Sequence, residues 1–264
     1  MIHLLLALQF LTRYPFRLPA GLELGERDLG KATRWFPVAG LFVGVDLLVL
    51  RWLLQWAGVL ERWPLAAAGL LLGYWVWSCD SLHLDGLADT ADGLASRRTG
   101  AEMLEVMHDS RSGAFGVQAV VVVLALKAAW LASLPPRLWW ALPLPMLFSR
   151  LLASLLCQSR PYAGNPGSLS GAFIVGCTPE DGHAAVAWAF TGFAALAGGA
   201  ILLGLAEPLD CLKALAACLA ALGVGWSLVG APRRRLGGIS GDLVGYGMQV
   251  CEVAAAYGLL FLKL

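Results

Sequence analysis

The sequence predicts an all-α, polytopic integral membrane protein with about seven transmembrane helices and additional short amphipathic or re-entrant helices. Of its 264 residues, 58% are hydrophobic and 14% are charged, whereas soluble domains have about a quarter charged residues. The apolar residues form segments of roughly 20 residues, the length that crosses a bilayer core. No internal repeat and no low-complexity linker divides the chain, so we expect a single domain over residues 1–264.

The expected elements can be taken in chain order. The first stretch, MIHLLLALQFLTRYPF, has an apolar run of only about ten residues, which predicts a short helix at the membrane surface rather than a span. It has no leading basic cluster and no small-residue cleavage site, so a signal peptide is not expected. Seven later segments have roughly spanning length: 35–59, 64–80, 114–134, 138–158, 184–206, 212–231 and 243–264.

Lys and Arg are distributed unevenly between the connections. One alternating set holds twelve of them and the other set holds four. Cytoplasmic loops carry the excess of basic residues, so the N-terminus and the rich connections are expected in the cytoplasm, and the C-terminus outside after seven spans. The rich connections are 1–34, 81–113, 159–183 and 232–242.

The remaining composition excludes several classes of protein. The net charge of +1 gives no indication of nucleic-acid binding. The six cysteines form no C-x-x-C pair, so we expect small buried apolar side chains rather than a zinc site or a disulfide framework.

The stretch HLDGLADTADGL (83–94) places three aspartates beside an apolar segment. On a helix, Asp85, Asp89 and Asp92 project at about 0°, 40° and −20° and form one stripe. Gly86 and Gly93 flank this stripe and are expected to leave room for a ligand. Three carboxylates repel one another unless a cation lies between them, and their oxygens suit Mg²⁺, Mn²⁺ or Ca²⁺. The stretch predicts a metal site, with a solvated acidic face as the alternative.

Arginines on the same predicted side indicate a phosphate-containing substrate. Arg97, Arg111 and Arg150 can each pair with phosphoryl oxygens through two parallel hydrogen bonds. The run from Arg233 to Arg235 is instead attributed to membrane topology, because basic residues belong on cytoplasmic loops.

The stretch GGISGDLVG (237–245) precedes the last apolar segment. Backbone amides in such a turn can bind an anion at a helix N-terminus, which makes Ser240 and Gly241 candidates for substrate binding. Asp242 would either cap the helix or join the metal. Glu252 lies inside the apolar helix, where a lone carboxylate is either functional or satisfied by an internal hydrogen bond.

Together these motifs resemble a known family. HLDGLADTADGL (83–94), M-x-D-S-R-x-G-x-x-G (107–116) and G-G-x-[ST]-G-D-x-x-G (237–245) are similar to motifs of the cobalamin synthases, the adenosylcobinamide-GDP ribazoletransferases. LQFLTRYP (8–15) and WFPVAGLFVG (35–44) match as well. The chain departs from the pattern at His108, where Arg is common, at Ser240, where Thr is common, and over 163–176, which matches loosely.

The resemblance implies a Mg²⁺-dependent transferase domain in the bacterial or archaeal cell (inner) membrane, with its active site facing the cytoplasm. It would join adenosylcobinamide-GDP to α-ribazole, or to its 5′-phosphate, at the last stage of cobalamin assembly and release GMP. The lipid bilayer is a further expected partner, nucleic acid is not, and an oligomer is left open.

The motifs and the resemblance together assign roles to thirteen positions. Catalysis is expected from Asp85, Asp89, Asp92 and Asp109; metal binding from Asp85, Asp89, Asp92 and Asp242; and substrate binding from Arg97, Ser110, Arg111, Gly113, Gly116, Arg150, Ser240 and Gly241. Any of the aspartates could accept the proton of the attacking ribazole hydroxyl.

Two other functions fit the sequence less well. A CDP-alcohol phosphotransferase has the pattern D-G-x-x-A-R, which requires Ala and Arg where this chain has Asp89 and Thr90. A cation transporter would place acids deep in several spans, whereas the acidic cluster here lies beside one end of the apolar segments. Both are therefore less favoured than the ribazoletransferase.

Overall fold

The computed structural model describes residues 1–19, 21, 24–109, 111–165 and 167–261, and within these ranges it contains helices and connections but no strands. An isolated bridge pairs Tyr162 with Ile239. The helices are α1 (Ile2–Leu11), α2 (Glu26–Ala32), α3 (Phe36–Trp56), α4 (Val59–Arg62), α5 (Pro64–Trp75), α6 (Ser81–Ala95), α7 (Gly100–Met107), α8 (Ala114–Ser133), α9 (Leu144–Cys157), α10 (Leu169–Gly176), α11 (Pro179–Leu202), α12 (Pro208–Leu236) and α13 (Gly241–Phe261).

Six helical stretches in the described ranges are long and apolar enough to cross a membrane: Glu26–Trp56, Ala114–Ser133, Pro136–Cys157, Pro179–Leu202, Pro208–Leu236 and Gly241–Phe261. The predicted segment 64–80 corresponds to Pro64–Cys79, which continues into Ser81–Ala95 after a bend of 86°. A π-helical turn, Val76–Asp80, lies at this bend. If the bent pair counts as one span, the total is seven, and the prediction of a polytopic all-α protein is confirmed.

Two helix boundaries differ from the prediction. The first span begins at Glu26 rather than at residue 35, because α2 continues through a short 3₁₀ turn into α3. Arg233, Arg234 and Arg235 form the last turn of α12 rather than a loop. Cations at a helix C-terminus are favoured by the helix dipole, and α12 ends at Gly237, whose φ of 83° is the left-handed conformation common after helices.

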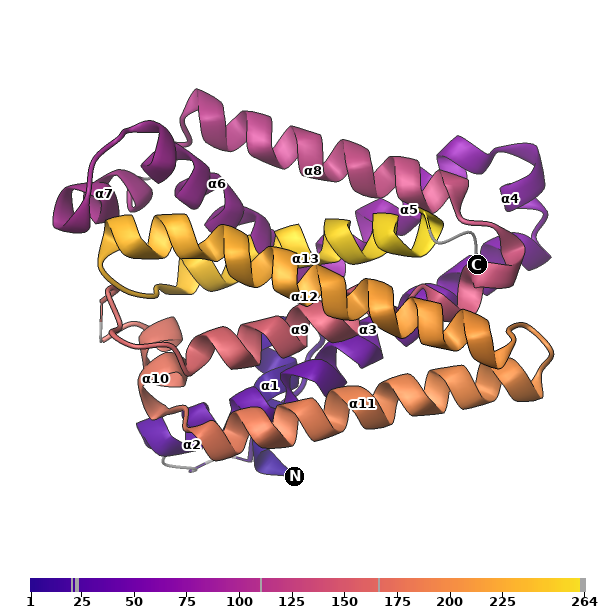
Figure 1. Ribbon diagram of the computed structural model, residues 1–264, viewed down its shortest axis with the longest axis horizontal. Helices are drawn as coiled ribbons and strands as arrows, with labels where there is room; N and C mark the ends of the chain where they lie inside the picture. Colours follow the sequence, from indigo (N-terminus) through magenta and orange to yellow (C-terminus); the bar gives the residue numbers. More distant parts are fainter. Residues whose placement is uncertain (20, 22–23, 110, 166, 262–264) are drawn as a thin grey trace.

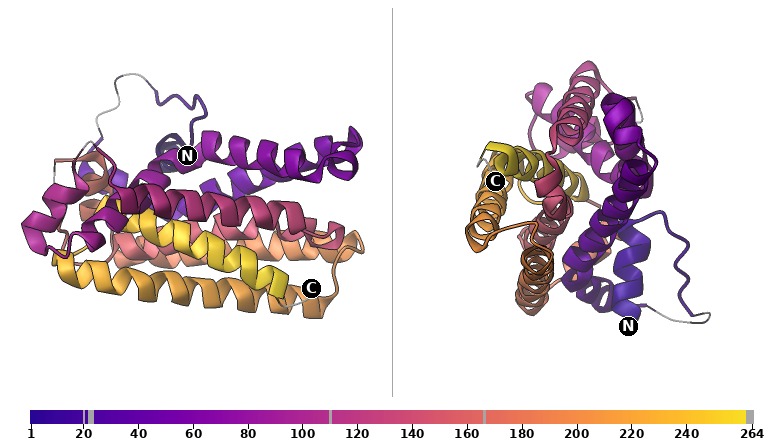
Figure 2. Two further views of the ribbon diagram at one scale, coloured as in Figure 1. Left: turned by 90° about the horizontal axis from the view of Figure 1, so that it is seen from above. Right: turned by 90° about the vertical axis from the view of Figure 1, so that its right-hand side faces the viewer.

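The long helices run side by side along the longest axis of the molecule, with α9 among them (Figure 1, Figure 2). Every residue of α9 except Leu155 is buried, as expected of a helix that is enclosed by others on all sides. Helices such as α8 and α12 instead expose apolar side chains, including Val121 and Leu228, which suits contact with lipid. All six cysteines are buried and form no disulfide, as predicted.

Three charged residues inside the spans, Lys127, Arg150 and Glu252, meet in one buried cluster between α8, α9 and α13. The Nζ of Lys127 lies 2.5 Å from the Glu252 carboxylate, and Arg150 forms an ion pair with the same carboxylate. The Ser149 hydroxyl donates to Glu252 at 3.1 Å. Glu252 is therefore satisfied internally. The Arg150 side chain is 1% exposed and neutralises this carboxylate, which gives it a structural role; its predicted binding of substrate stays a prediction.

The polar motifs gather at one end of the bundle. Figure 1 shows α6, α7, α10 and the connection between α12 and α13 together on its left. The short α4 and the connection between α11 and α12 lie at the opposite end. The connections rich in Lys and Arg and those poor in them thus lie at opposite ends of the molecule.

Candidate active site

A cavity of about 450 Å³ opens at this polar end. Its lining comes from α6, from the end of α7 and the connection before α8, from the connection before α10 and the start of α10, and from the start of α13 with the residue before it. The residues that line it are Asp85, Asp89, Met107, His108, Asp109, Ser112, Tyr162, Gly164, Asn165, Ser168, Ser170, Ser240, Gly241 and Asp242.

Three of its carboxylates come from two helices that touch at a glycine. Asp85 and Asp89 lie one turn apart on α6, and Asp242 lies in the first turn of α13. A Cβ atom at Gly86 would lie 2.7 Å from the carbonyl oxygen of Asp242. The expectation that Gly86 leaves space for a ligand is therefore wrong. Its missing side chain lets α6 and α13 meet backbone to backbone, which brings Asp242 to the α6 carboxylates.

Gly86→Ala is expected to reduce activity strongly. The added methyl group would displace α13 relative to α6, and misplacement of catalytic groups by about 1 Å costs roughly 100-fold in rate. The measurement is the rate of product release by purified protein. Gly73→Ala is the matched control, because a Cβ atom at Gly73 on α5 meets nothing within 4 Å. Equal rates for both variants would contradict this role of Gly86.

Asp92 does not line the cavity with its two neighbours. One of its carboxylate oxygens accepts from the amide of Gly113 at 2.7 Å, and the other accepts from the amide of Gly116 at 2.9 Å. The first amides of a helix have no partner within the helix, and a carboxylate there is favoured by the dipole. Asp92 therefore caps α8 from α6, while its roles in metal binding and catalysis stay predictions.

The same contacts show a structural role for two glycines that were predicted to bind substrate. A Cβ atom at either Gly113 or Gly116 would lie 2.4 Å from the Asp92 carboxylate, and at Gly116 also 2.9 Å from the Ala88 carbonyl oxygen. These glycines thus bring the start of α8 against α6, and their amides donate to Asp92; their binding of substrate stays a prediction. Gly93 likewise packs on Met107 and Met103 instead of flanking open space.

The predicted phosphate-binding arginines lie outside the cavity lining. Arg97 is exposed in the connection after α6, where its φ is 60°. The Arg111 side chain is 87% exposed and donates to the Asp109 carboxylate at 3.0 and 3.2 Å. This hydrogen bonding lowers the pKa of Asp109 from its ordinary value. Asp109 itself lines the cavity, whereas Arg111 pairs with this neighbour and is not among the lining residues.

The start of α13 agrees better with the prediction. Ser240 and Gly241 both line the cavity, and the Ser240 hydroxyl accepts from the amide of Leu243 at 3.3 Å. Gly241 lies against Ser170, since a Cβ atom there would come within 2.8 Å of that side chain. Their binding of substrate stays a prediction. Ser110, predicted to bind substrate, lies outside the described residues.

Several lining residues were not predicted as site residues. Tyr162, Asn165, Ser168 and Ser170 come from RPYAGNPGSLSG (160–171), whose only signal in the sequence is a polar stretch between two apolar segments. The Ser168 hydroxyl caps α10 by accepting from the Gly171 amide at 3.0 Å.

Arg160 secures the other end of α10. Its guanidinium donates to the carbonyl oxygens of Ile174, Val175 and Cys177 at 2.7, 3.0 and 3.2 Å. The last carbonyls of a helix lack partners within the helix, so one side chain satisfies this end and fixes α10 at the cavity.

The donor set of the cavity fits a hard divalent cation. In the described part of the chain, no three His, Cys, Asp or Glu side chains are arranged so that they could hold a metal ion by themselves. Asp85, Asp89 and Asp242 nevertheless line one cavity, and no Lys or Arg occurs among its described lining residues. Mg²⁺ is commonly bound by one or two carboxylates together with substrate phosphates and water, so an open set of this kind can accept it along with a diphosphate.

Comparison with known proteins agrees with the motifs. The family described as cobalamin-5-phosphate synthase matches residues 3–260. The chain is 38% identical to the adenosylcobinamide-GDP ribazoletransferase of Stutzerimonas stutzeri, covering 98% of each chain. It is 35% identical to that of Leptothrix cholodnii, covering 97% of this chain and 93% of the relative. It is 32% identical to the adenosylcobinamide-GDP ribazoletransferase of Acetivibrio thermocellus, covering 99% of this chain and 97% of the relative. No solved structure matches. The chain belongs to the cobalamin-5-phosphate synthase family.

Proposed function

We propose that the protein is an adenosylcobinamide-GDP ribazoletransferase that uses Mg²⁺. It joins adenosylcobinamide-GDP to α-ribazole, or to its 5′-phosphate, and releases GMP. The observation that carries this proposal is the convergence of Asp85, Asp89 and Asp242 on one cavity, in a chain whose relatives bear that name over nearly their whole length.

The reaction breaks the phosphoanhydride bond of the diphosphate and forms a phosphodiester bond. A hydroxyl oxygen of the ribazole forms a bond to the phosphorus nearest the cobinamide, and the bond from that phosphorus to the bridging oxygen breaks. GMP leaves with the bonding electrons, and a cavity carboxylate takes up the hydroxyl proton. Mg²⁺ bound by Asp85, Asp89 and Asp242 would neutralise charge on the diphosphate. Catalysis of this kind rests mainly on positioning and electrostatic stabilisation.

The two alternative functions are not favoured. The relatives named above are ribazoletransferases rather than CDP-alcohol phosphotransferases. The carboxylates that a transporter would distribute along a path lie instead at one end of the bundle, and Glu252, deep in a span, is neutralised by Lys127 and Arg150.

The proposed activity has a direct assay. Purified protein is incubated with adenosylcobinamide-GDP, α-ribazole and Mg²⁺, and GMP is measured. Release of GMP should require both substrates, stop with a chelator and return with excess Mg²⁺. The same assay with α-ribazole 5′-phosphate identifies the preferred acceptor. Failure to release GMP with either acceptor would exclude the function.

The bias in basic residues supports an orientation in the cell membrane with the cavity facing the cytoplasm. A reporter fused after residue 98 is expected to behave as cytoplasmic, and one fused after residue 264 as external. An external reporter at residue 98 would place the cavity on the wrong side of the membrane for this proposal. A cytoplasmic reporter at residue 264 would show that the number of spans differs from seven by an odd number.

A further inference from the structure

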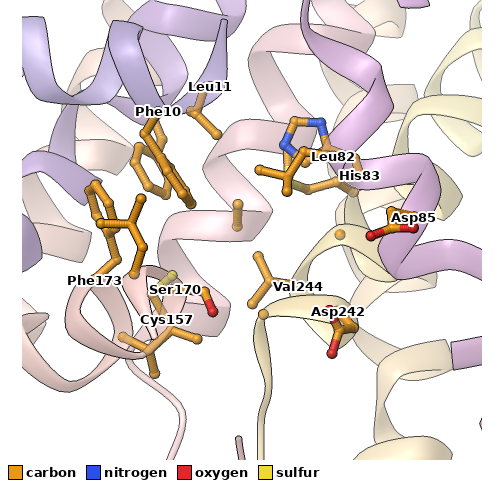
Figure 3. A pocket seen from close by; sticks show the side chains of 17 residues that line it. Phe10, Leu11, Leu82, His83, Asp85, Cys157, Ser170, Phe173, Asp242 and Val244 are labelled. Carbon is orange, nitrogen blue, oxygen red and sulfur yellow. The ribbon is translucent and has the colours of Figure 1, made fainter. Parts of the chain in front are cut away.

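The cavity lined by Asp85, Asp89 and Asp242 is called the acidic cavity below. A second cavity of about 290 Å³ adjoins it and extends into the bundle. Four residues, Asp85, Ser170, Gly241 and Asp242, line both cavities. Figure 3 shows Phe10 and Phe173 on one side of this second cavity and the two carboxylates on the other. A ligand that occupies it therefore has an apolar end among aromatic rings and a polar end beside Asp85 and Asp242.

Most of the wall of this cavity is apolar. The rings of Phe10 and Phe173 are stacked with their centroids 4.2 Å apart, and Phe36 packs beside Phe173 at 5.8 Å. Val244 and Met248 of α13 contribute further apolar surface. Small-molecule sites of about 300–1,000 Å³ typically combine an apolar lining with a few polar groups that orient the ligand. The volume of this cavity lies just below that range, and its lining has that composition.

We propose that this cavity binds the aromatic base of the nucleoside acceptor and directs the attached ribose to Asp85 and Asp242. This inference rests on the proposed function, since it assigns a subsite to one of the two substrates. The base of α-ribazole is a flat benzimidazole with two methyl groups, so it is apolar over both faces and along one edge. Aromatic rings contribute to binding through large contact areas and offset or edge-to-face contacts.

The other parts of the substrates suit this cavity poorly. A corrin ring with its amide side chains is far larger than about 290 Å³. Guanine has several hydrogen-bonding groups along its edges, and a polar group buried without a partner costs free energy. The diphosphate belongs beside the carboxylates of the neighbouring cavity. The acceptor base is the part whose size and polarity match.

Binding of the base in this cavity would also position the attacking hydroxyl for catalysis. The base would enter the bundle at one side, while the ribose would lie at the boundary that Asp85 and Asp242 share between the two cavities. A ribose hydroxyl would then be held beside the carboxylates and facing the diphosphate. Fixing a nucleophile in this way removes the entropic cost of bringing two reactants together.

Filling the cavity tests the proposal. Val244→Phe adds a ring at a residue that lines it, as Figure 3 shows. We expect the KM for α-ribazole to rise by about tenfold or more, with the KM for adenosylcobinamide-GDP changed less than about twofold and kcat at saturation largely kept. Val253→Phe is the matched control on the same helix, because nine residues turn it about 180° from Val244.

A second measurement needs no variant. Free 5,6-dimethylbenzimidazole should inhibit the parent protein competitively against α-ribazole and not against adenosylcobinamide-GDP. Phe173→Leu, which removes a ring and keeps the wall apolar, should weaken this inhibition severalfold even if Val244→Phe fails to fold. Competition against adenosylcobinamide-GDP, or equal inhibition of the parent and Phe173→Leu, would overturn the proposal.

Two further outcomes are distinguishable. If a co-purified lipid is displaced by Val244→Phe while the KM for α-ribazole is unchanged, the cavity is a lipid site and the inference is wrong. If the parent releases no GMP with either acceptor, the proposed function itself fails. An active parent for which Val244→Phe and Val253→Phe give the same KM for α-ribazole would remove only the subsite.

Discussion

Asp89→Asn is expected to reduce GMP release by roughly 1,000-fold or more, because charge neutralisation and positioning account for most of the catalysis of phosphoryl transfer. Asp89 lines the acidic cavity, lies one turn from Asp85 on α6, and faces Asp242 across the contact at Gly86. The substitution keeps the shape of the side chain and removes its charge. The measurement is GMP release at saturating concentrations of both substrates and Mg²⁺.

Stability separates this effect from unfolding. Removing one of several like charges relieves repulsion, so the variant without ligands should melt at or above the temperature of the parent. Mg²⁺ with the diphosphate substrate should stabilise the parent by mass action and stabilise Asp89→Asn less. Asp210→Asn, at the start of α12, is a control for the lost charge. Full activity in Asp89→Asn, or a parent whose melting ignores Mg²⁺ and diphosphate together, would leave the carboxylates as a solvated acidic face.

Glu252→Gln is expected to cause the largest loss of stability. It leaves Lys127 and Arg150 buried without the negative charge that both contact. Removing one partner from a buried ion pair typically costs roughly 3–5 kcal/mol. The variant should melt at a clearly lower temperature in detergent and accumulate less in the membrane, because the cluster joins α8, α9 and α13.

The partner of this carboxylate supplies the control. Lys127→Met removes one of the two cations, and in combination with Glu252→Gln it should recover part of the lost stability. A double-mutant cycle then measures the coupling between the two residues. If Glu252→Gln melts like the parent, or if the two losses simply add, the cluster does not stabilise the bundle in the way its geometry implies.

Much of the fold could be predicted from the sequence, since length and apolarity of a segment are local properties. The spans were located in this way, and the alternation of basic connections placed the polar motifs at one end. The bend before α6 could not be predicted, because 64–80 reads as an ordinary apolar segment. The start of the first span at Glu26 could not be predicted either, because polar residues in the first turns of a span resemble a loop.

Only part of the site could be predicted, because the spacing of residues along one helix is local and the contacts between helices are not. Helical spacing places Asp85, Asp89 and Asp92 on one stripe, but it does not show which other element covers each of them. Asp92 meets Gly113, 21 residues further along the chain, and Lys127 meets Glu252 at a separation of 125 residues. Contacts of this range decide which polar groups face a ligand and which only hold helices together.

The position of α10 has a consequence for how the two substrates bind. Ser170 lines both cavities and Phe173 lines the apolar one, while Arg160 attaches the end of this helix to the bundle. Any shift of α10 therefore changes the affinity of both cavities at once. Thermodynamic linkage is reciprocal, so an acceptor that favours one position of α10 must alter the affinity for the diphosphate substrate by the same factor as the diphosphate alters the affinity for the acceptor. An eight-residue helix would in that sense couple the affinities for the two substrates, together with the parts of α6 and α13 that line both cavities.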